Sequence, residues 1–146
     1  MGDYRPSHVG LCVRDLARSL RFFCDGLGFE KAEDFELDST TAEGLDRSLE
    51  VPGPTRIVSQ FVQNDTMKIE LLHFIEPGVG GTPSAARNQL GLTHLSFYVD
   101  DLDAATRHLV EYGATVVEGT RASPGIDLLF LADPDGVRVE LMAAPE

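Results

Sequence analysis

Two histidines and two glutamates recur at equivalent positions along this sequence. His8 and His94 each open a short alternating apolar stretch, and Glu70 and Glu140 each lie inside an otherwise apolar segment. A carboxylate in such a segment is costly unless something pairs with it. A single histidine of this kind is more typical of a core or surface side chain, but the matched set favours a shared partner. Imidazole and carboxylate ligands suit a divalent metal ion, so the four residues predict a metal site.

The spacing of these residues indicates an internal repeat. His8 and His94 are 86 residues apart, as are Asp15 and Asp101, each of which begins an Asp-Leu pair. The two glutamates are only 70 residues apart, so the first copy carries an additional segment, which we place at residues 38–54. A segment inserted beside a repeated scaffold either determines substrate specificity or forms a solvated surface loop. The sequence leaves both alternatives open.

The first copy is predicted to form a strand, a helix and three further strands. Alternating apolar residues predict a strand over residues 7–14, and Asp15 is placed to cap the following helix. The buried face of that helix is predicted to hold Leu16, Leu20, Phe23 and Leu27. Strands are predicted over residues 29–35, near a sheet edge, and over residues 56–63 and 67–75, which form a hairpin. Inside the insertion, Ser39 or Thr40 is expected to cap a short helix.

The second copy repeats this order, so each half is expected to be a βαβββ module. A strand over residues 92–99 precedes a helix capped by Asp100 or Asp101 and ended by Gly113. The predicted buried face of this helix consists of Leu102, Ala105, Leu109 and Tyr112. Strands follow at residues 114–118, 126–132 and 137–143, with a turn at residues 133–136. The predicted fold is α+β, with modules at residues 1–76 and 91–146 and a linker at residues 77–90.

The composition excludes several classes of function. The chain has 146 residues and a formal net charge of −12, so it is poorly suited to bind nucleic acid or an acidic membrane surface. No signal peptide or apolar span is visible, and we expect a soluble, cytoplasmic protein. Cys12 and Cys24 do not form a disulfide framework and are expected to be thiols. His73 and His108 are expected to lie outside the metal site.

The residues that carry these patterns resemble the vicinal oxygen chelate superfamily. That superfamily includes glyoxalase I, methylmalonyl-CoA epimerase, extradiol ring-cleavage dioxygenases, fosfomycin-resistance enzymes and bleomycin-binding proteins. The resemblance covers residues 7–143. Its marks are His8 before Val-Gly-Leu-Cys-Val-Arg-Asp-Leu, Phe22-Phe23 before Leu27-Gly28-Phe29, Ile-Glu-Leu-Leu at Glu70, Thr-His-Leu-Ser-Phe at His94, and Asp133-Pro-Asp-Gly before Glu140.

The resemblance implies two modules that curl into a metal-binding cleft with the helices outside. His8, Glu70, His94 and Glu140 fall on the four ligand positions of bacterial glyoxalase I. The implied metal is Ni, Co, Zn or Mn. Epimerases commonly have Gln at the position of Glu70. In the ring-cleavage dioxygenases the corresponding Fe(II) ligands are His8, His94 and Glu140 alone. A carboxylate at residue 70 therefore favours chemistry other than oxygenation.

The activity implied is metal-dependent proton transfer at a carbon next to a carbonyl, by an isomerase, an epimerase or a glyoxalase-type lyase. By resemblance Glu140 is the first candidate for the base and Glu70 the second. The alternatives are an Fe(II) dioxygenase and a non-catalytic protein that binds an antibiotic or another small molecule. Glu50 is either a second catalytic carboxylate or an exposed loop residue. The expected partners are a small-molecule substrate and a second copy of the chain in a homodimer.

An anionic substrate would need basic residues at the site. The candidates are Arg14, Arg47, Arg56 and Arg87. In so acidic a chain, most of these arginines are expected to lie on the ordinary surface.

Overall fold

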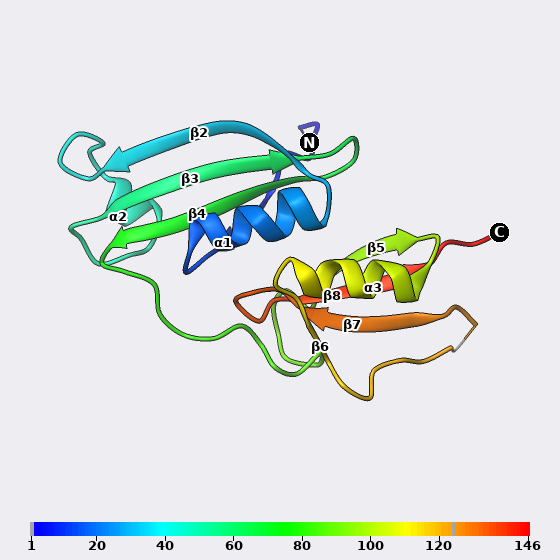
Figure 1. Ribbon diagram of the computed structural model, residues 1–146. Coiled ribbons are helices and arrows are strands. Elements are labelled where there is room, and N and C mark those ends of the chain that lie inside the picture. The colour runs from blue at the N-terminus through cyan, green and yellow to red at the C-terminus, as the bar shows by residue number, and fades with distance from the viewer. Residues whose placement is uncertain (1, 124) are drawn as a thin grey trace. The chain divides into compact units, whose positions relative to one another are not determined.

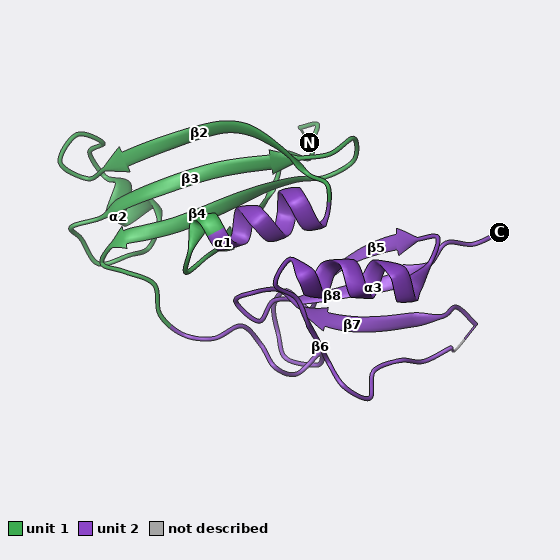
Figure 2. Ribbon diagram, viewed as in Figure 1, with its two compact units in different colours: residues 1–17, 28–80 green, residues 18–27, 81–146 purple. Residues whose placement is uncertain are grey.

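A computed structural model describes residues 2–123 and 125–146. It contains two four-stranded sheets, each belonging to one compact unit (Figure 1). The first unit consists of residues 1–17 and 28–80, and the second of residues 18–27 and 81–146 (Figure 2). The predicted α+β fold of two repeated modules is confirmed.

The sheet of the first unit has the strand order β1-β4-β3-β2. Its strands are β1 (Val9–Cys12), β2 (Glu30–Asp38), β3 (Arg56–Gln63) and β4 (Lys68–Glu76). β1 is parallel to β4, and the other neighbours are antiparallel. The predicted hairpin is confirmed: Asn64 Oδ1 accepts the backbone N–H groups of Thr66 and Met67 in the turn between β3 and β4. The predicted edge position of the strand that follows the first helix is also confirmed.

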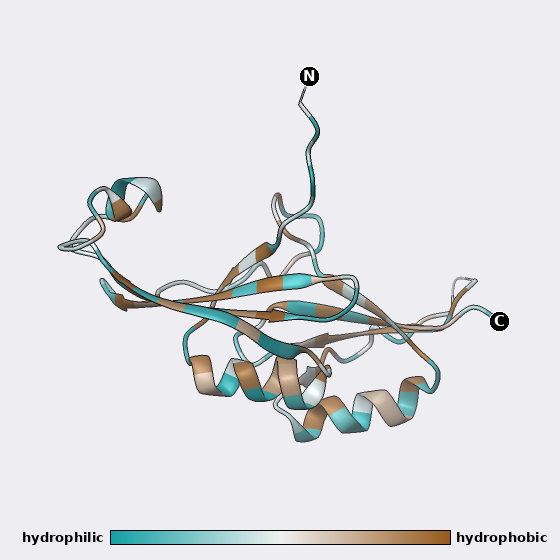
Figure 3. Ribbon diagram, turned by 90° about the horizontal axis from the view of Figure 1, so that it is seen from above, coloured by the Kyte–Doolittle hydropathy of each residue, from teal (hydrophilic) through white to brown (hydrophobic). Residues whose placement is uncertain are grey.

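Hydrophobic and hydrophilic residues alternate along the strands, as side chains on opposite faces require (Figure 3). In the first unit the buried apolar strand residues are Leu11, Ile57, Phe61, Val62, Ile69 and Leu71. Glu70 lies between two of them on β4 and therefore projects from the other face of the strand. Leu11, Ile69 and Leu71 lie on the opposite face, whereas Ile57 and Phe61 share the face of Glu70, so the candidate ligands lie among buried apolar side chains.

The sheet of the second unit has the equivalent order β5-β8-β7-β6. Its strands are β5 (Leu95–Val99), β6 (Thr115–Val116), β7 (Leu128–Ala132) and β8 (Arg138–Ala143). β6 is shorter than predicted and pairs with β7 through two residues. α3 (Leu102–Glu111) packs against this sheet. As predicted, Asp101 caps α3 by accepting the N–H of Ala104, and Gly113 follows its end with a φ of 104°.

The first helix differs from its prediction in the face that it buries. It begins as α1 (Leu16–Leu20) and continues as the π-helical turn η1 (Arg21–Gly26). Its buried residues are Ser19, Phe22 and Phe23, whereas Leu16, Leu20 and Leu27 are only half-buried. The N–H of Leu27 donates to Phe22 O, five residues earlier. A π-helical turn contains more residues than an α-helical turn. A buried face predicted from 3.6 residues per turn is therefore displaced around the helix axis.

The last turn of this helix packs against α3 within the second unit. His108 Nε2 lies 2.9 Å from Gly26 O. A Cβ atom added at Gly26 would lie 3.2 Å from Tyr112 and 3.3 Å from Leu109, so glycine permits this close approach. The guanidinium of Arg21 lies over the ring of Tyr112, 5.0 Å from its centroid. The helix of the first repeat therefore contributes to the second compact unit.

The inserted segment contains one short helix, α2 (Leu45–Ser48). The predicted cap at Ser39 or Thr40 is wrong, because Gly44 with a φ of 83° precedes the helix. Ser39 Oγ instead accepts the N–H of Thr55 at 3.0 Å, and Thr40 donates to Asp38 Oδ1. Ser39 therefore joins the two ends of the insertion, and Thr40 stabilises the turn at the end that follows Asp38.

Two further observations concern the described part of the chain. Within it, no helix is long and apolar enough to cross a membrane. Cys12 and Cys24 form no disulfide there, as expected.

Candidate functional site

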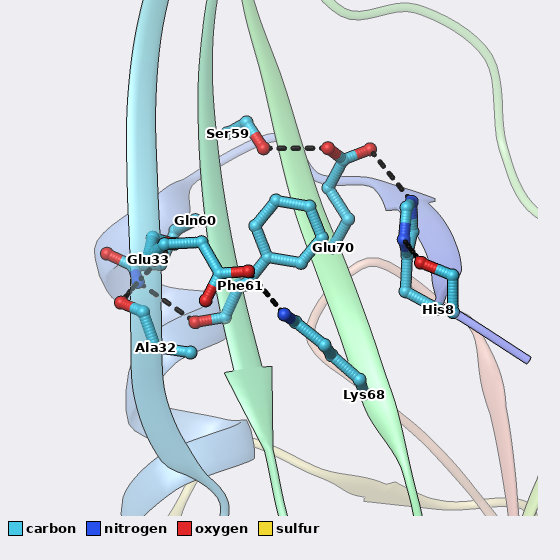
Figure 4. A network of polar contacts seen from close by, with 9 residues as sticks. His8, Ala32, Glu33, Ser59, Gln60, Phe61, Lys68 and Glu70 are labelled. Carbon is cyan, nitrogen blue, oxygen red and sulfur yellow. Dashed lines mark hydrogen bonds and ion pairs between the residues drawn. The ribbon is translucent and has the colours of Figure 1, made fainter.

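A histidine–glutamate pair lies on the sheet of the first unit. His8 Nε2 is 3.9 Å from Glu70 Oε1 (Figure 4). Ser59 Oγ donates a hydrogen bond of 2.8 Å to the other carboxylate oxygen, Glu70 Oε2. The histidine side chain is 34 % exposed and the glutamate side chain 22 % exposed. The pair is thus accessible to a small ligand while its carboxylate is held in one orientation.

Two further side chains fix the ring of His8. Ser7 Oγ lies 2.8 Å from His8 Nδ1. The ring of Phe61 meets the imidazole edge to face, with 5.0 Å between centroids. In the tautomer whose Nδ1–H donates to Ser7 Oγ, Nε2 carries a lone pair, and this nitrogen is the one that lies near Glu70.

The second unit contains the same arrangement. His94 Nε2 lies 3.8 Å from Glu140 Oε2, and these side chains are 29 % and 14 % exposed. Ser96 Oγ donates to Glu140 Oε1 at 2.8 Å. Thr93 Oγ1 lies 2.7 Å from His94 Nδ1, and the ring of Phe130 meets the imidazole edge to face at 5.1 Å. Each unit therefore supplies one histidine, one carboxylate, a hydroxyl for each, and an aromatic wall.

Strand register explains why the two arrangements match. In the second unit, Glu140 on β8 pairs with Ser96 on β5 and with Phe130 on β7. In the first unit, Glu70 on β4 pairs with a residue of β1 and with a phenylalanine of β3 in the same manner. His8 lies two residues before Gly10, the β1 neighbour of Glu70, and His94 lies two residues before Ser96, the β5 neighbour of Glu140. Since side chains alternate along an extended chain, this spacing directs the histidine to the face that carries the glutamate.

The two pairs differ in the strand that supplies the serine. Ser96 is the direct neighbour of Glu140, but the equivalent neighbour of Glu70 is Gly10, which has no side chain. Ser59, on β3, holds Glu70 instead. The same carboxylate orientation is thus reached by two routes.

The donor set fits a divalent cation. The separations of 3.9 Å and 3.8 Å between nitrogen and oxygen are too long for a hydrogen bond. One ion with bonds of about 2.1 Å to each atom spans up to about 4.2 Å and can contact both. Two imidazoles and two carboxylates suit Zn, Ni, Co or Mn. In residues 2–123 and 125–146, no group of three or more histidine, cysteine, aspartate or glutamate side chains is arranged to hold a metal ion. The candidate ligands are instead found as two histidine–glutamate pairs, one in each unit.

The other two histidines and Glu50 lie apart from these pairs. His73 Nδ1 is 3.0 Å from Val13 O, and His108 bonds to a backbone carbonyl of the first helix. Glu50 is exposed just beyond α2, with a φ of 55°, in agreement with the exposed-loop alternative. Arg14 donates to Val79 O at 3.4 Å, and Arg87 donates to Ser84 O.

The hydroxyl and aromatic residues that contact each histidine were not predicted from the sequence. For the hydroxyl residues, however, the sequence contains a signal. Ser7 and Thr93 are 86 residues apart, the spacing shared by the histidines that they contact. Phe61 and Phe130 could be assigned only once the strand register was known, because each lies on a different strand from the histidine it touches.

The comparisons with known proteins agree with this architecture. Residues 5–141 match the Glyoxalase/Bleomycin resistance protein/Dioxygenase superfamily. The chain is 32 % identical over 144 residues to the uncharacterized protein YaeR of Escherichia coli (strain K12), covering 97 % of each chain. It is 25 % identical over 146 residues to catechol-2,3-dioxygenase of Bacillus subtilis (strain 168), covering 96 % of this chain but only 42 % of that enzyme.

Among solved structures, a glyoxalase family protein from Bacillus cereus shares the fold with a TM-score of 0.80 and 21 % identity. The similarity covers 98 % of this chain and 95 % of that chain. Because the family match spans nearly the whole sequence and both repeated modules are present, the chain belongs to the glyoxalase/bleomycin resistance protein/dioxygenase superfamily.

Proposed function

We propose that this protein is a divalent-metal-dependent enzyme that transfers a proton at a carbon next to a carbonyl group of a chelating small molecule. The metal ligands in this proposal are His8, Glu70, His94 and Glu140, and the metal is Ni, Co, Zn or Mn. One observation carries the proposal: both histidines face a carboxylate, and each carboxylate is fixed by a serine hydroxyl. Such fixed outer partners are typical of metal ligands.

The bound ion would withdraw electrons from the substrate oxygens and so acidify the neighbouring C–H bond. The protein residues then supply orientation and a base. Ser96 fixes Oε1 of Glu140, so Oε2 would be the oxygen that leaves the metal and accepts the proton from carbon. The side chain of Glu140 is 14 % exposed, so little water competes for that proton. Return of the proton to the opposite face of the same carbon gives epimerisation, and return to the adjacent carbon gives isomerisation.

Glu70 supports this choice of reaction over oxygenation. A carboxylate held by Ser59 and facing His8 adds a fourth protein ligand, so fewer positions remain for both a substrate and O₂. We therefore rank an isomerase or lyase above an Fe(II) dioxygenase.

Bound metal tests the proposal directly. Protein expressed without added metal and then reconstituted should hold near-stoichiometric Ni, Co, Zn or Mn by elemental analysis. Both Glu70→Gln and His94→Ala should lose most of it. His108→Ala is the matched control, because this exposed histidine lies outside both pairs, and it should retain the wild-type content. Wild-type protein that binds no metal after reconstitution would overturn the proposal.

The second candidate function is an Fe(II) dioxygenase. The 25 % identity to catechol-2,3-dioxygenase favours it. In that case iron should be retained in Glu70→Gln and lost in His94→Ala, and a catechol should drive oxygen uptake. Proton exchange into carbonyl substrates without oxygen uptake would exclude this candidate.

We also propose that the protein is a homodimer, and mixing variants tests how the two pairs combine. His8→Ala and His94→Ala each remove one pair. If one site takes its pairs from two copies, co-refolding the variants should regenerate an intact site and bind metal. If each site uses a single chain, the mixture should bind no more than the separate variants.

A further inference from the structure

Two arginines line adjoining cavities within the second unit. Arg87 and Arg138 are both half-buried. A cavity of about 340 Å³ is lined by Ala85, Arg87, Val117, Thr120, Phe130 and Arg138. A second cavity, of about 270 Å³, has both arginines and Thr93 in its wall. Arg87 and Arg138 therefore line both cavities.

These cavities adjoin the His94–Glu140 pair. Phe130, in the wall of the first cavity, packs against the ring of His94, and Thr93, in the wall of the second, contacts its Nδ1 atom. Arg138 precedes Glu140 by two residues on β8 and so projects from the same face of the strand. Each cavity therefore shares one wall residue, Phe130 or Thr93, with the surroundings of His94.

Both arginines lack a carboxylate partner within the described residues, although acidic residues outnumber basic ones by 24 to 12. Arg87 donates to Ser84 O, and Arg138 Nη1 donates to Gly136 O at 2.8 Å. Burial lowers the pKa of Arg87, and the positive charge of Arg138 acts in the same direction. Two neighbouring cations without an anion between them are unfavourable, and a bound anion would relieve this.

In the first unit, the residue equivalent to Arg138 is a lysine whose charge is neutralised by a carboxylate. Lys68 precedes Glu70 by two residues, as Arg138 precedes Glu140, but Lys68 forms an ion pair with Glu33 (Figure 4). Its ammonium group also lies over the ring of Phe61, 4.8 Å from the centroid. The cation at this position is thus satisfied internally in one unit and left available in the other.

We propose that Arg87 and Arg138 bind an anionic oxygen group of the substrate, a carboxylate or a phosphate, beside the His94–Glu140 pair. The assignment deepens the proposed function by naming the substrate class. Planar guanidinium groups recognise such anions through paired N–H donors. The larger cavity is also lined by Ala85, Val117 and Phe130. In this proposal the anionic group is therefore attached to a small apolar part of the substrate.

Anion binding to metal-free protein tests this proposal independently of the metal. Benzoate and inorganic phosphate are titrated into the protein, with NMR shifts of the Thr93 and Arg138 backbone amides as the readout. Benzamide, which has the shape of benzoate without its charge, is the ligand control. We expect saturable binding of at least one anion, none of benzamide, and weaker binding as salt is added. Benzoate binding alone indicates a carboxylate and phosphate binding alone a phosphate.

Variants locate the site. Arg87→Gln and Arg138→Gln should each weaken anion binding at least tenfold, whereas Arg138→Lys should retain part of it. Arg107→Gln removes the same charge from the exposed face of α3 and should leave binding unchanged. The metal content of both glutamine variants should stay at the wild-type level, which separates this proposal from the proposed function. No saturable binding of either anion, or equal binding by all variants, would overturn the assignment.

Discussion

Ser96 on β5 donates a hydrogen bond of 2.8 Å to Glu140 Oε1 on the neighbouring parallel strand β8. This bond holds the carboxylate so that its other oxygen faces His94. Ser96→Ala leaves the first carboxylate oxygen without this donor and lets the side chain rotate. We expect metal affinity to fall by about 10- to 100-fold, as for other outer-sphere partners. Competition with a metal-binding dye measures it, and wild-type affinity in Ser96→Ala would contradict the role assigned to the hydroxyl.

The two routes to a fixed carboxylate allow a rescue experiment. Ser59→Ala should weaken metal binding through Glu70, as Ser96→Ala does through Glu140. A Cβ atom at Gly10 would lie 3.8 Å from Glu70 Oε1, in ordinary contact, so a serine fits there. Adding Gly10→Ser to Ser59→Ala should recover only part of the lost affinity, because the new hydroxyl is nearest Oε1, the oxygen that faces His8, whereas Ser59 holds Oε2.

The control for this rescue is Gly10→Ala. It adds the Cβ atom without a hydroxyl and should recover nothing. The difference between the serine and alanine substitutions, analysed as a double-mutant cycle, isolates the hydrogen bond from the added volume. Equal behaviour of the two substitutions would show that the hydroxyl at this position does not reach Glu70.

Metal removal should lower the stability of the folded protein. An ion that binds the native state at about 100 times its Kd adds about 2.7 kcal/mol to the free energy of unfolding. Thermal unfolding with and without a chelator should therefore show a lower midpoint for the metal-free protein. The shift should be largely absent in His94→Ala and preserved in His108→Ala. A chelator effect of the same size in both variants would indicate that the ion binds elsewhere.

Sequence patterns predicted the repeated scaffold because they depend on short-range chemistry. The alternation around Leu11 and Leu71 records which side chains are buried, and the Asp101 cap and Gly113 end reflect the local needs of a helix. The shared spacing of His8 and His94 was visible without coordinates. These features are properties of neighbouring residues, so the sequence alone contains them.

The features that the sequence did not predict depend on contacts between distant segments or on departures from ideal geometry. The π-helical turn at Phe22 shifts the buried face because one turn contains an additional residue. Ser59 reaches Glu70 from a different strand, so its role depends on register rather than on a motif. Arg138 resembles Lys68 in position, and the difference between them is visible only when Glu33 is placed beside the lysine.

Asp133 should make stability depend on pH in an unusual direction. It is 4 % exposed, and burial raises its pKa to about 6, although the N–H groups of Asp135 and Val137 donate to its side chain. Between about pH 4 and about pH 6 the unfolded chain has lost this proton while the folded chain keeps it. The contribution of Asp133 to stability is therefore greatest below this window and falls as the pH rises through it, by up to about 3 kcal/mol.

Asp133→Asn should remove this loss, because an amide oxygen accepts the same two N–H groups and has no proton to release. The variant and the wild type should unfold alike near about pH 4, and the variant should be the more stable above about pH 6. Asp65→Asn, in the exposed turn between β3 and β4, is the control and should follow the wild-type curve. Denaturant unfolding measures the free energy of unfolding of each protein across this pH range. If it changes with pH equally in the wild type and in Asp133→Asn, Asp133 ionises in the folded protein as readily as in the unfolded chain.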